Sequence, residues 1–551
     1  MEKIWLKQYP TGVPEDITID DNANLIDFFE SISHQFADKT AFRNFGHSMS
    51  YAKLDADSQA LAAYLQQQNL QKGDRVAIMM PNLLQYPVAL FAILRAGMVA
   101  VNVNPLYTAP EVASQLNDAQ ASAIIVLSNF ASTVAAVAEK TTLKHMIVTD
   151  LGDMLPSLKR ITINFIAKYI KKMVPAFKLP QAIHWRDMLA RGQQLHYKRP
   201  DISGDDIAFL QYTGGTTGKS KGTMLTHRNI IANTEQAYVW FKQLIAGKEA
   251  IVAVAALPLY HIFALVANLF LFMRFGQTNL LVTNPRDIHG FIKLLKQEKF
   301  SVIIGVNTLF NALINHKDFA KLDFSRLLIG LGGGMAVQES IAEKWKNIVG
   351  KLLMEGYGLT EASPIVAVMP FNQTEFDGSI GLPLPSTEIK IIDDDGKELP
   401  QGETGELCVR GPQVMKGYWQ QAEETKMVLS EDGWLKTGDM ARVDDIGRVY
   451  LVDRKKDMIL VSGFNVYPNE IEDILVSHPG IKEAAVIGVA AKSRGEAVKA
   501  FIVKQEESLT EENVRTYCRE HLTAYKRPKF IEFRDELPKN NVGKILRRAL
   551  R

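Results

Sequence analysis

The sequence contains two cysteines, Cys408 and Cys518. Two thiols so far apart exclude a disulfide framework and a four-thiolate zinc site. The sequence also has no large excess of positive or negative charge, since the formal net charge is +2. The net charge therefore gives no reason to expect nucleic acid as a partner. The first residues, Met1–Trp5, lack the apolar core of a signal peptide, so we expect a cytoplasmic protein in a reducing setting.

Two common nucleotide-binding motifs are missing as well. A Walker A loop ending at Gly218 would need glycine where Thr213 stands, which disfavours an ordinary P-loop ATPase. The glycine-rich stretch at 330–334 is followed by Met335, where the dinucleotide fingerprint requires glycine. The sequence therefore lacks the motif of both of these nucleotide-binding folds.

One hydrophobic run is long enough to be mistaken for a membrane span. Residues 251–273 carry no charge, but Pro258, Tyr260 and His261 interrupt them. Because proline marks a boundary, we predict a buried strand at 251–257 and a buried helix at 262–273.

Up to about residue 350, apolar strands alternate with helices, which predicts α/β sheets with parallel strands covered on both faces. The expected strands lie at 75–79, 99–103, 122–127, 207–210, 279–282, 301–304 and 327–329. From about Ser379 short strands separated by Gly and Asp turns predict a small β-rich subdomain. We therefore expect a large domain at 1–455, with its β-rich subdomain at about 379–455, and a small α+β domain at 456–551.

The strongest local signal is the loop Tyr212–Gly222, which follows the apolar strand at 207–210 and precedes a helix from about His227. Its glycines and hydroxyls offer backbone N–H groups and side chains that suit polyphosphate oxygens, and Lys219 and Lys221 add positive charge. The loop predicts a phosphate-binding site.

The segment Lys159–Lys178 is basic, has no acidic residue and interleaves cations with apolar side chains. Such a helix can lie on an anionic membrane surface, which would make the protein peripheral on the inner face of the cytoplasmic membrane. It can equally pack on its own domain with a solvated cationic face. The pattern leaves both interpretations open.

At the phosphate loop the sequence resembles the adenylate-forming (AMP-binding) superfamily, and further motifs follow in that family's order. They are Pro258–His261, Gly356–Glu361, Gly405–Gly411, Trp434–Asp439, Asp453–Asp457 and Pro538–Lys544. The chain is most similar to bacterial long-chain fatty acid–CoA ligases, over nearly its full length, for example at Pro81–Leu90, Thr283–Ile288 and Asp432–Val461. The resemblance implies a large N-terminal domain and a small, mobile C-terminal domain.

The resemblance also implies a reaction and its partners. The fatty acid would attack the α-phosphate of ATP to give acyl-AMP and pyrophosphate, and the thiol of CoA would then take the acyl group. Because the first step brings anions together, it needs cationic groups and Mg²⁺, which prefers oxygen ligands. The family suggests a homodimer too.

Site residues are carried over from the matching motifs. Those expected to hold ATP are Thr213, Gly214, Gly215, Thr216, Thr217, Gly218, Lys219, Gly332, Gly333, Gly334, Tyr357, Gly358, Thr360, Asp439, Arg454 and Lys456. Within this set, Thr213–Lys219 match the phosphate-binding loop, Tyr357 the residue against adenine, and Asp439 the acceptor of the ribose hydroxyls, with Arg454 assisting. Thr216 and Glu361 match the residues that place Mg²⁺.

Three further residues are expected to act in the reaction. Lys544 matches the lysine that bridges the substrate carboxylate and the α-phosphate, and Lys456 matches the hinge about which the C-terminal domain turns. His261, in an apolar tract, is expected to line the acyl pocket near the reacting carboxylate, although a purely structural histidine fits the same pattern.

Other readings stay open within and beyond the superfamily. The substrate could be another acyl or aryl carboxylate, or the enzyme could stop at the adenylate as a fatty acyl-AMP ligase. A peptide-synthetase module is disfavoured, because such a module would normally carry a carrier domain with a phosphopantetheine serine, which this sequence lacks. Luciferase-type oxygen chemistry is possible on the same scaffold, but no residue demands it. A non-catalytic nucleotide sensor could dispense with Lys544, so its retention together with Glu361 favours an enzyme.

Overall fold

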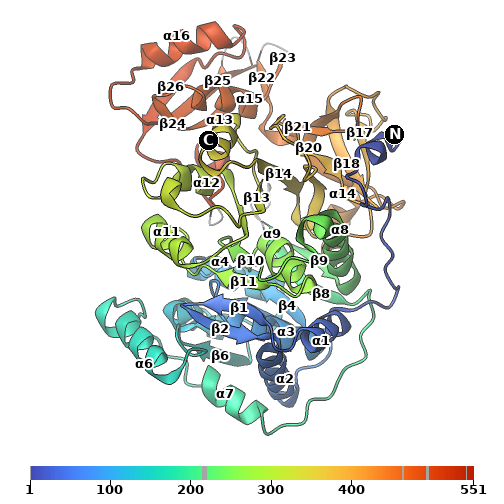
Figure 1. Cartoon of the computed structure of the whole chain (residues 1–551), viewed down its shortest axis with the longest axis vertical. Coiled ribbons are helices and arrows are strands. Elements are labelled where there is room, and N and C mark those ends of the chain that lie inside the picture. The colour runs from blue at the N-terminus through green and yellow to red at the C-terminus, as the bar shows by residue number, and fades with distance from the viewer. Residues whose placement is uncertain (1, 214–219, 462–463, 492–494, 541–542) are drawn as a thin grey trace.

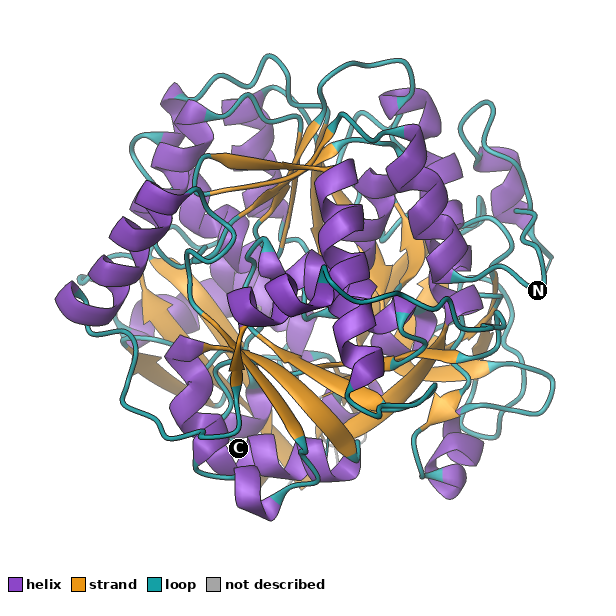
Figure 2. Ribbon diagram, turned by 90° about the horizontal axis from the view of Figure 1, so that it is seen from below, coloured by secondary structure: helices purple, strands orange, loops and turns teal. Residues whose placement is uncertain are grey.

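The computed structural model describes residues 2–213, 220–461, 464–491, 495–540 and 543–551. A nine-stranded sheet and an eight-stranded sheet form most of the N-terminal part, and helices cover them (Figures 1 and 2). A four-stranded sheet and a five-stranded sheet follow toward the C-terminus.

The nine-stranded sheet has the order β16-β15-β14-β13-β12-β10-β11-β1-β2. Its strands are β1 (Thr40–Asn44), β2 (His47–Ser50), β10 (Val252–Ala255), β11 (Thr278–Leu281), β12 (Val302–Gly305), β13 (Ile329–Gly333), β14 (Leu353–Gly358), β15 (Ile365–Val368) and β16 (Leu382–Pro383). From β14 to β1 all neighbours are parallel, and the pairs at the two ends of the sheet are antiparallel.

The eight-stranded sheet has the order β19-β9-β8-β4-β3-β5-β6-β7. Its strands are β3 (Arg75–Met79), β4 (Val99–Asn102), β5 (Ala121–Leu127), β6 (His145–Thr149), β7 (Ile183–His184), β8 (Ile207–Thr213), β9 (Lys221–Thr226) and β19 (Gly417–Tyr418). The parallel centre of both sheets confirms the α/β prediction. The antiparallel strands β2, β9, β15, β16 and β19 were not predicted, and neither were the parallel strands β1, β6, β7 and β14.

The helices of the N-terminal part are amphipathic or wholly buried. They are α1 (Leu25–Gln35), α2 (Tyr51–Gln67), α3 (Gln85–Arg95), α4 (Ala109–Asp118), α5 (Ala131–Ala135), α7 (Trp185–Gly192), α8 (His227–Ile245), α11 (Ile288–Gln297), α12 (Asn307–Ile314) and α13 (Glu339–Val349). Every residue of α3 is buried, as expected for a helix that is mostly apolar on all sides.

The uncharged run at 251–273 folds as predicted, into strand β10 and then a helical stretch after Pro258. That stretch consists of α9 (Ile262–Ala264), a π-helical turn η5 (Leu265–Phe270) and α10 (Leu271–Arg274). Nearly all of it is buried in the main core. Among the described residues, no helix combines the length and the apolar character needed to cross a membrane.

The four-stranded antiparallel sheet contains β17 (Glu388–Ile392), β18 (Gly405–Arg410), β20 (Leu435–Val443) and β21 (Val449–Arg454), with α14 (Ala422–Val428) beside it. After the short helix η8 (Lys455–Asp457), the last sheet begins. It is built from β22 (Ile459–Val461), β23 (Phe464–Val466), β24 (Ile481–Ala491), β25 (Gly495–Lys504) and β26 (Phe530–Arg534). Together with α15 (Pro468–Val476) and α16 (Glu511–His521) it encloses a separate hydrophobic core, at the top of Figure 1.

The basic segment forms helix α6 (Ser157–Phe165), continued by the π-helical turn η4 (Ile166–Ile170). It therefore ends before Lys178, the expected end of the segment. No residue of α6 is buried, and the helix lies at the periphery of the molecule (Figure 1). Its apolar side chains are exposed to an unusual degree, including Leu158 at 84%, Ile170 at 63% and Ile161 at 61%.

Candidate active site

A cavity of about 1100 Å³ opens where the carboxyl ends of β12, β13 and β14 meet the four-stranded sheet and the C-terminal unit. Ligands of open parallel sheets generally bind at this edge. The walls include Tyr357 from β14, Asp439 from β20, Arg454 from β21 and Lys544 from the C-terminal unit. Residues far apart in the sequence thus face one space.

The predicted glycine cluster closes one wall of the cavity, and packing requires glycine there. A Cβ at Gly332 would lie 2.4 Å from Cγ2 of Val337, and a Cβ at Gly333 would lie 2.8 Å from Cζ of Phe263. Gly334 has φ +74° and lines the cavity. Packing thus explains the glycines at 332 and 333, and the role of this stretch beside the adenine stays a prediction.

Tyr357, Asp439 and Arg454 form a connected group. The hydroxyl of Tyr357 donates to Oδ2 of Asp439 at 2.7 Å, and Nε of Arg454 lies 3.4 Å from Oδ1 of the same carboxylate. Asp439 and Arg454 are direct partners in the β20–β21 ladder, which explains their proximity. Burial and the charge of Asp439 raise the pKa of Tyr357, so its phenol stays protonated and donates.

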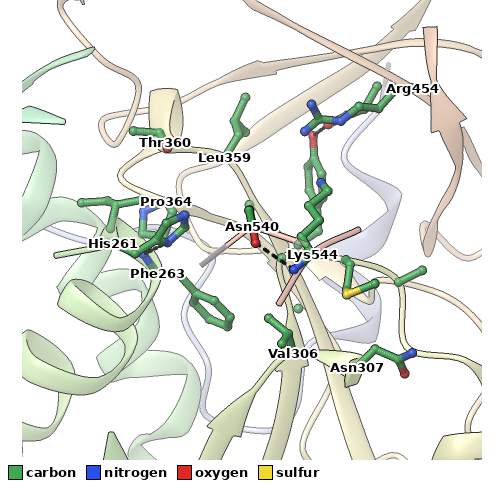
Figure 3. Close-up of a pocket in the computed structure, with 18 of the residues that line it drawn as sticks. His261, Phe263, Val306, Asn307, Leu359, Thr360, Pro364, Arg454, Asn540 and Lys544 are labelled. Atoms are coloured by element: carbon green, nitrogen blue, oxygen red, sulfur yellow. Dashed lines mark hydrogen bonds and ion pairs between the residues drawn. The ribbon is translucent and has the colours of Figure 1, made fainter. Parts of the chain in front are cut away.

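Lys544 lies in a loop that the rest of the protein holds against the cavity. Its N–H donates to Oδ1 of Asn540 at 2.8 Å, and the hydroxyl of Thr308 in α12 donates to the carbonyl oxygen of Gly543 at 3.0 Å. The second bond joins the C-terminal unit to the N-terminal part. Figure 3 shows Lys544 on the same side of the cavity as Arg454, with His261 on the other side.

The charge of Lys544 is poorly solvated in this position. Burial, and after it the positive charge of Arg454, lower the pKa of its amine from 10.5 to about 8. Asp439 acts in the opposite direction and favours the charged form. A lysine tuned in this way in a cavity is typical of a functional site.

His261 lies on the cavity wall at the start of α9. Its Nδ1 accepts the N–H of Phe263 at 3.3 Å, which places the ring proton of the neutral form on Nε2. Burial, followed by the charge of Lys544, lowers the pKa of His261 to about 4, so the imidazole is neutral near pH 7. His261 caps a helix and also lines the cavity. The two interpretations of the sequence, a structural histidine and a histidine of the pocket, are therefore compatible.

Glu361 and Thr360 belong to the short helix η7 (Thr360–Ala362), and both line the cavity. Oε1 of Glu361 accepts the hydroxyl of Tyr418 at 2.8 Å. Within the described ranges, Glu361 forms no ion pair and its Oε2 has no hydrogen-bond partner. A cavity-lining carboxylate with one uncommitted oxygen fits a hard divalent cation such as Mg²⁺. The preceding Gly358 is also tightly placed, because a Cβ there would lie 2.2 Å from the oxygen of Pro364.

The phosphate loop differs from its prediction in one respect. Thr213 ends β8, and Gly214, Gly215, Thr216, Thr217, Gly218 and Lys219 lie outside the described residues. Strand β9 pairs antiparallel with β8, so the loop joins two strands of a hairpin, and α8 begins only after β9. The N-terminus of α8 is therefore one strand away from the loop, and the roles predicted for these residues, Thr216 included, rest on the loop's own backbone and hydroxyls.

Lys456 lies in η8, the short connection between β21 and β22, and borders the cavity. Burial and the nearby charge of Arg454 lower its pKa. Its place between the two C-terminal sheets is the one expected of a hinge.

Sequence reasoning missed three residues of the site. Tyr418, Thr308 and Asn540 contact Glu361, Gly543 and Lys544, respectively. Asn540 stands inside the motif that ends at Lys544, so the motif itself was a signal for it. Thr308 and Tyr418 reach the site from separate elements, and nothing in their local sequence shows this.

The fold and this cavity define an adenylate-forming ligase: two α/β sheets with a β-rich sheet beside them, and a small C-terminal unit that contributes a lysine to the site. The chain belongs to the AMP-binding enzyme family. It matches the family of AMP-binding enzymes over residues 29–419 and the AMP-binding enzyme C-terminal domain over residues 470–544.

Similar proteins span the whole chain. A long-chain-fatty-acid–CoA ligase of Escherichia coli is 57% identical over 553 residues, which cover 100% of this chain and 98% of that protein. A Bacillus subtilis ligase of the same name is 38% identical over the same shares of both chains. Among solved structures, an anthranilate CoA ligase in complex with anthranoyl-AMP has a TM-score of 0.85 at 25% identity and covers 97% of each chain. ATP-bound MatB from Rhodopseudomonas palustris has a TM-score of 0.82 at 28% identity and covers 96% of this chain and 98% of its own.

Proposed function

We propose that this protein is an AMP-forming long-chain fatty acid–CoA ligase. A fatty acid carboxylate attacks the α-phosphate of ATP, which releases pyrophosphate and forms acyl-AMP. The thiol of CoA then attacks the acyl carbon, which releases AMP and forms acyl-CoA. Full-length relatives that are 53–57% identical and carry this activity in their names support the proposal.

The observation that carries the proposal is the mixed lining of the cavity. Tyr357, Asp439, Arg454 and Lys544 contribute polar groups. Apolar side chains come from α8, α9–α10 and neighbouring segments, and they are Phe241, Ile262, Phe263, Ala267, Leu271, Phe272, Val302, Ile304, Ile329, Leu331, Val368 and Ile380. Each methylene buried against such side chains contributes about 0.8 kcal/mol, which favours a long acyl chain with its carboxylate near the polar groups.

In the first step, the protonated amine of Lys544 stabilises the charge that develops between the carboxylate and the α-phosphate. Asp439 accepts hydrogen bonds from the ribose hydroxyls, and Tyr357 lies against the adenine. The loop Thr213–Lys219 holds the β- and γ-phosphates. A neutral His261 adds no charge next to the carboxylate, and it can donate a hydrogen bond from Nε2.

We assign Mg²⁺ to Glu361 and Thr216. The carboxylate oxygen of Glu361 that has no partner among the described residues supports the assignment. When bound, the cation neutralises phosphate charge and so lowers the barrier to attack by an anion.

For the second step, we propose that the C-terminal unit, residues 456–551, turns about Lys456 and withdraws Lys544 from the cavity. The contacts that have to be released include the bond from Thr308 to Gly543. CoA then approaches the acyl-AMP from the side that the C-terminal unit vacates.

A series of acids from acetate to stearate, with an aryl acid included, tests this function in the presence of ATP, Mg²⁺ and CoA. We expect AMP and thioester to appear in equal amounts and the rate constant to favour long chains. Preference for a short or aryl acid would assign another carboxylate, and acyl-AMP without thioester would indicate a fatty acyl-AMP ligase. ADP as product, or no reaction with any acid, would refute the proposal.

We propose in addition that α6 and η4 attach the enzyme peripherally to anionic lipid at the inner face of the cytoplasmic membrane. The supporting observation is the exposure of Leu158, Ile161, Phe165, Tyr169 and Ile170 beside a series of cations. A helix packed on its own domain would bury these side chains. By family resemblance we also propose a homodimer, which sedimentation equilibrium tests.

A further inference from the structure

Tyr418 is a buried tyrosine, 7% exposed, that reaches the metal-binding carboxylate from an unexpected direction. It lies in the two-residue strand β19, which pairs antiparallel with β9 so that Tyr418 stands opposite Thr223. The next residue, Trp419, donates its N–H to the oxygen of Gly222 at 2.7 Å. Main-chain pairing thus holds Tyr418 beside the strand that leaves the phosphate loop.

The hydroxyl of Tyr418 donates to Oε1 of Glu361 at 2.8 Å. One carboxylate oxygen is therefore committed to Tyr418. The second oxygen has no partner among the described residues, and Glu361 lines the cavity.

The ring of Tyr418 is held from a second side. Nζ of Lys221, the first residue of β9, lies 5.1 Å from the ring centroid and also pairs with Glu424. The main-chain N–H of Tyr418 donates to Oγ1 of Thr425 at 2.9 Å. Both the base of the phosphate loop and α14 therefore determine where the phenol points.

We infer that Tyr418 is a positioning residue for magnesium-bound ATP. Its hydroxyl orients the carboxylate of Glu361. Its ring contacts Lys221, the first residue of the strand that follows the phosphate loop. The inference rests on the proposed function, because it assumes that Glu361 holds the cation. Tyr418 acts through Glu361 and has no contact with the nucleotide in this scheme.

The test is Tyr418→Phe, with Tyr450→Phe as a matched control. Tyr450 lies on strand β21, and its hydroxyl donates to Oδ2 of Asp444 at 3.3 Å. The control therefore removes a part-buried tyrosine–carboxylate bond of the same kind, between two residues that do not line the cavity. ATP binding is measured by calorimetry without fatty acid, once with Mg²⁺ and once with EDTA.

We expect Tyr418→Phe to weaken ATP binding about tenfold in Mg²⁺, because the variant loses a hydrogen bond to the charged carboxylate of Glu361. Binding in EDTA should be unchanged, because the orientation of Glu361 affects ATP binding only through the cation. The Mg²⁺ concentration for half-maximal AMP formation should rise as well. Tyr450→Phe should change neither quantity. In a double-mutant cycle, Tyr418→Phe should have no further effect on a Glu361→Gln background.

Equal effects with Mg²⁺ and EDTA, effects shared by Tyr450→Phe, or loss of folding in Tyr418→Phe alone would overturn the inference, since each shows a role in packing. These outcomes differ from a failure of the proposed function. If Glu361→Gln itself leaves the Mg²⁺ dependence unchanged, the metal assignment fails, and if the wild-type enzyme forms no AMP, the whole function fails.

Discussion

The hydroxyl of Tyr357 lies 2.7 Å from Oδ2 of Asp439 and joins the end of β14 in the nine-stranded sheet to β20 in the four-stranded sheet. Both residues are 8% exposed, so the bond is shielded from water. The two side chains proposed to hold the adenine and the ribose are thus bonded to each other before ATP arrives. Ribose hydroxyls that bind Asp439 have to share its carboxylate with this phenol.

Replacing Asp439 should therefore weaken ATP binding strongly. We expect Asp439→Ala to raise the KM for ATP by about 10- to 100-fold, because hydrogen bonds to a buried charged group contribute roughly 1.5–3 kcal/mol. Tyr357→Phe removes the phenol but keeps the ring, and should change KM by less than about fivefold. Initial rates of pyrophosphate release measure both, and a larger effect of Tyr357→Phe would contradict the assignment.

Lys544→Ala should separate the two half-reactions. Loss of a positioned charge costs about 10²- to 10³-fold in rate, and we expect this loss in adenylation. Thioester formation from supplied acyl-AMP should be largely retained. Lys539→Ala is the control, because Lys539 belongs to the same motif but its amine is already paired with Glu483 at 2.6 Å. Equal loss in both half-reactions would remove the catalytic role of Lys544.

The lowered pKa of Lys544, about 8, predicts an alkaline limit to adenylation. The amine is charged below this pH and loses its proton above it, so kcat/KM should fall about tenfold per pH unit beyond pH 8. The negative phosphates of bound ATP favour the charged form of the Lys544 amine. The alkaline fall of kcat, which reports the enzyme with ATP bound, should therefore occur at a higher pH than that of kcat/KM. Lys544→Arg stays charged, so any remaining activity should lack this limb, and a limb shared by both enzymes would assign the ionisation to another group.

Lys456→Pro should spare the first step and slow the second. Proline fixes φ near −65°, which restricts the proposed turn of the C-terminal unit after adenylation. We expect pyrophosphate release in a single turnover to be close to wild type and acyl transfer from acyl-AMP to be reduced about tenfold or more. Unchanged rates in both steps would place the hinge elsewhere.

Neutralising Lys168, Lys171 and Lys172 should weaken binding to vesicles that contain anionic lipid by about 1 kcal/mol per cation. Phe165→Ser should also reduce binding, since the ring is 53% exposed on the same segment. Flotation of the holoenzyme with the vesicles measures binding, and activity on a soluble acid serves as the control for folding. Flotation equal to wild type in both variants would exclude α6 as an attachment segment.

Much of the fold could be read from periodicity. Strand β3 occupies the predicted residues 75–79. Strand β13 was placed too early, at 327–329 instead of Ile329–Gly333, because its glycines carry no apolar signal. Strands β9 and β19 were missed because backbone pairing joins β9 to β8 and to the remote strand β19, and no local apolar pattern marks such pairing.

The sequence by itself determined the family, the order of the motifs and the identity of the residues proposed for ATP, because each motif is local and keeps its spacing along the chain. The tertiary structure decided which of these residues meet. It placed Asp439 on Tyr357, gave Lys544 its lowered pKa through burial beside Arg454, and added Tyr418 and Thr308 to the site. These outcomes depend on solvation and on distances between segments that are remote in the sequence, and no local pattern contains either.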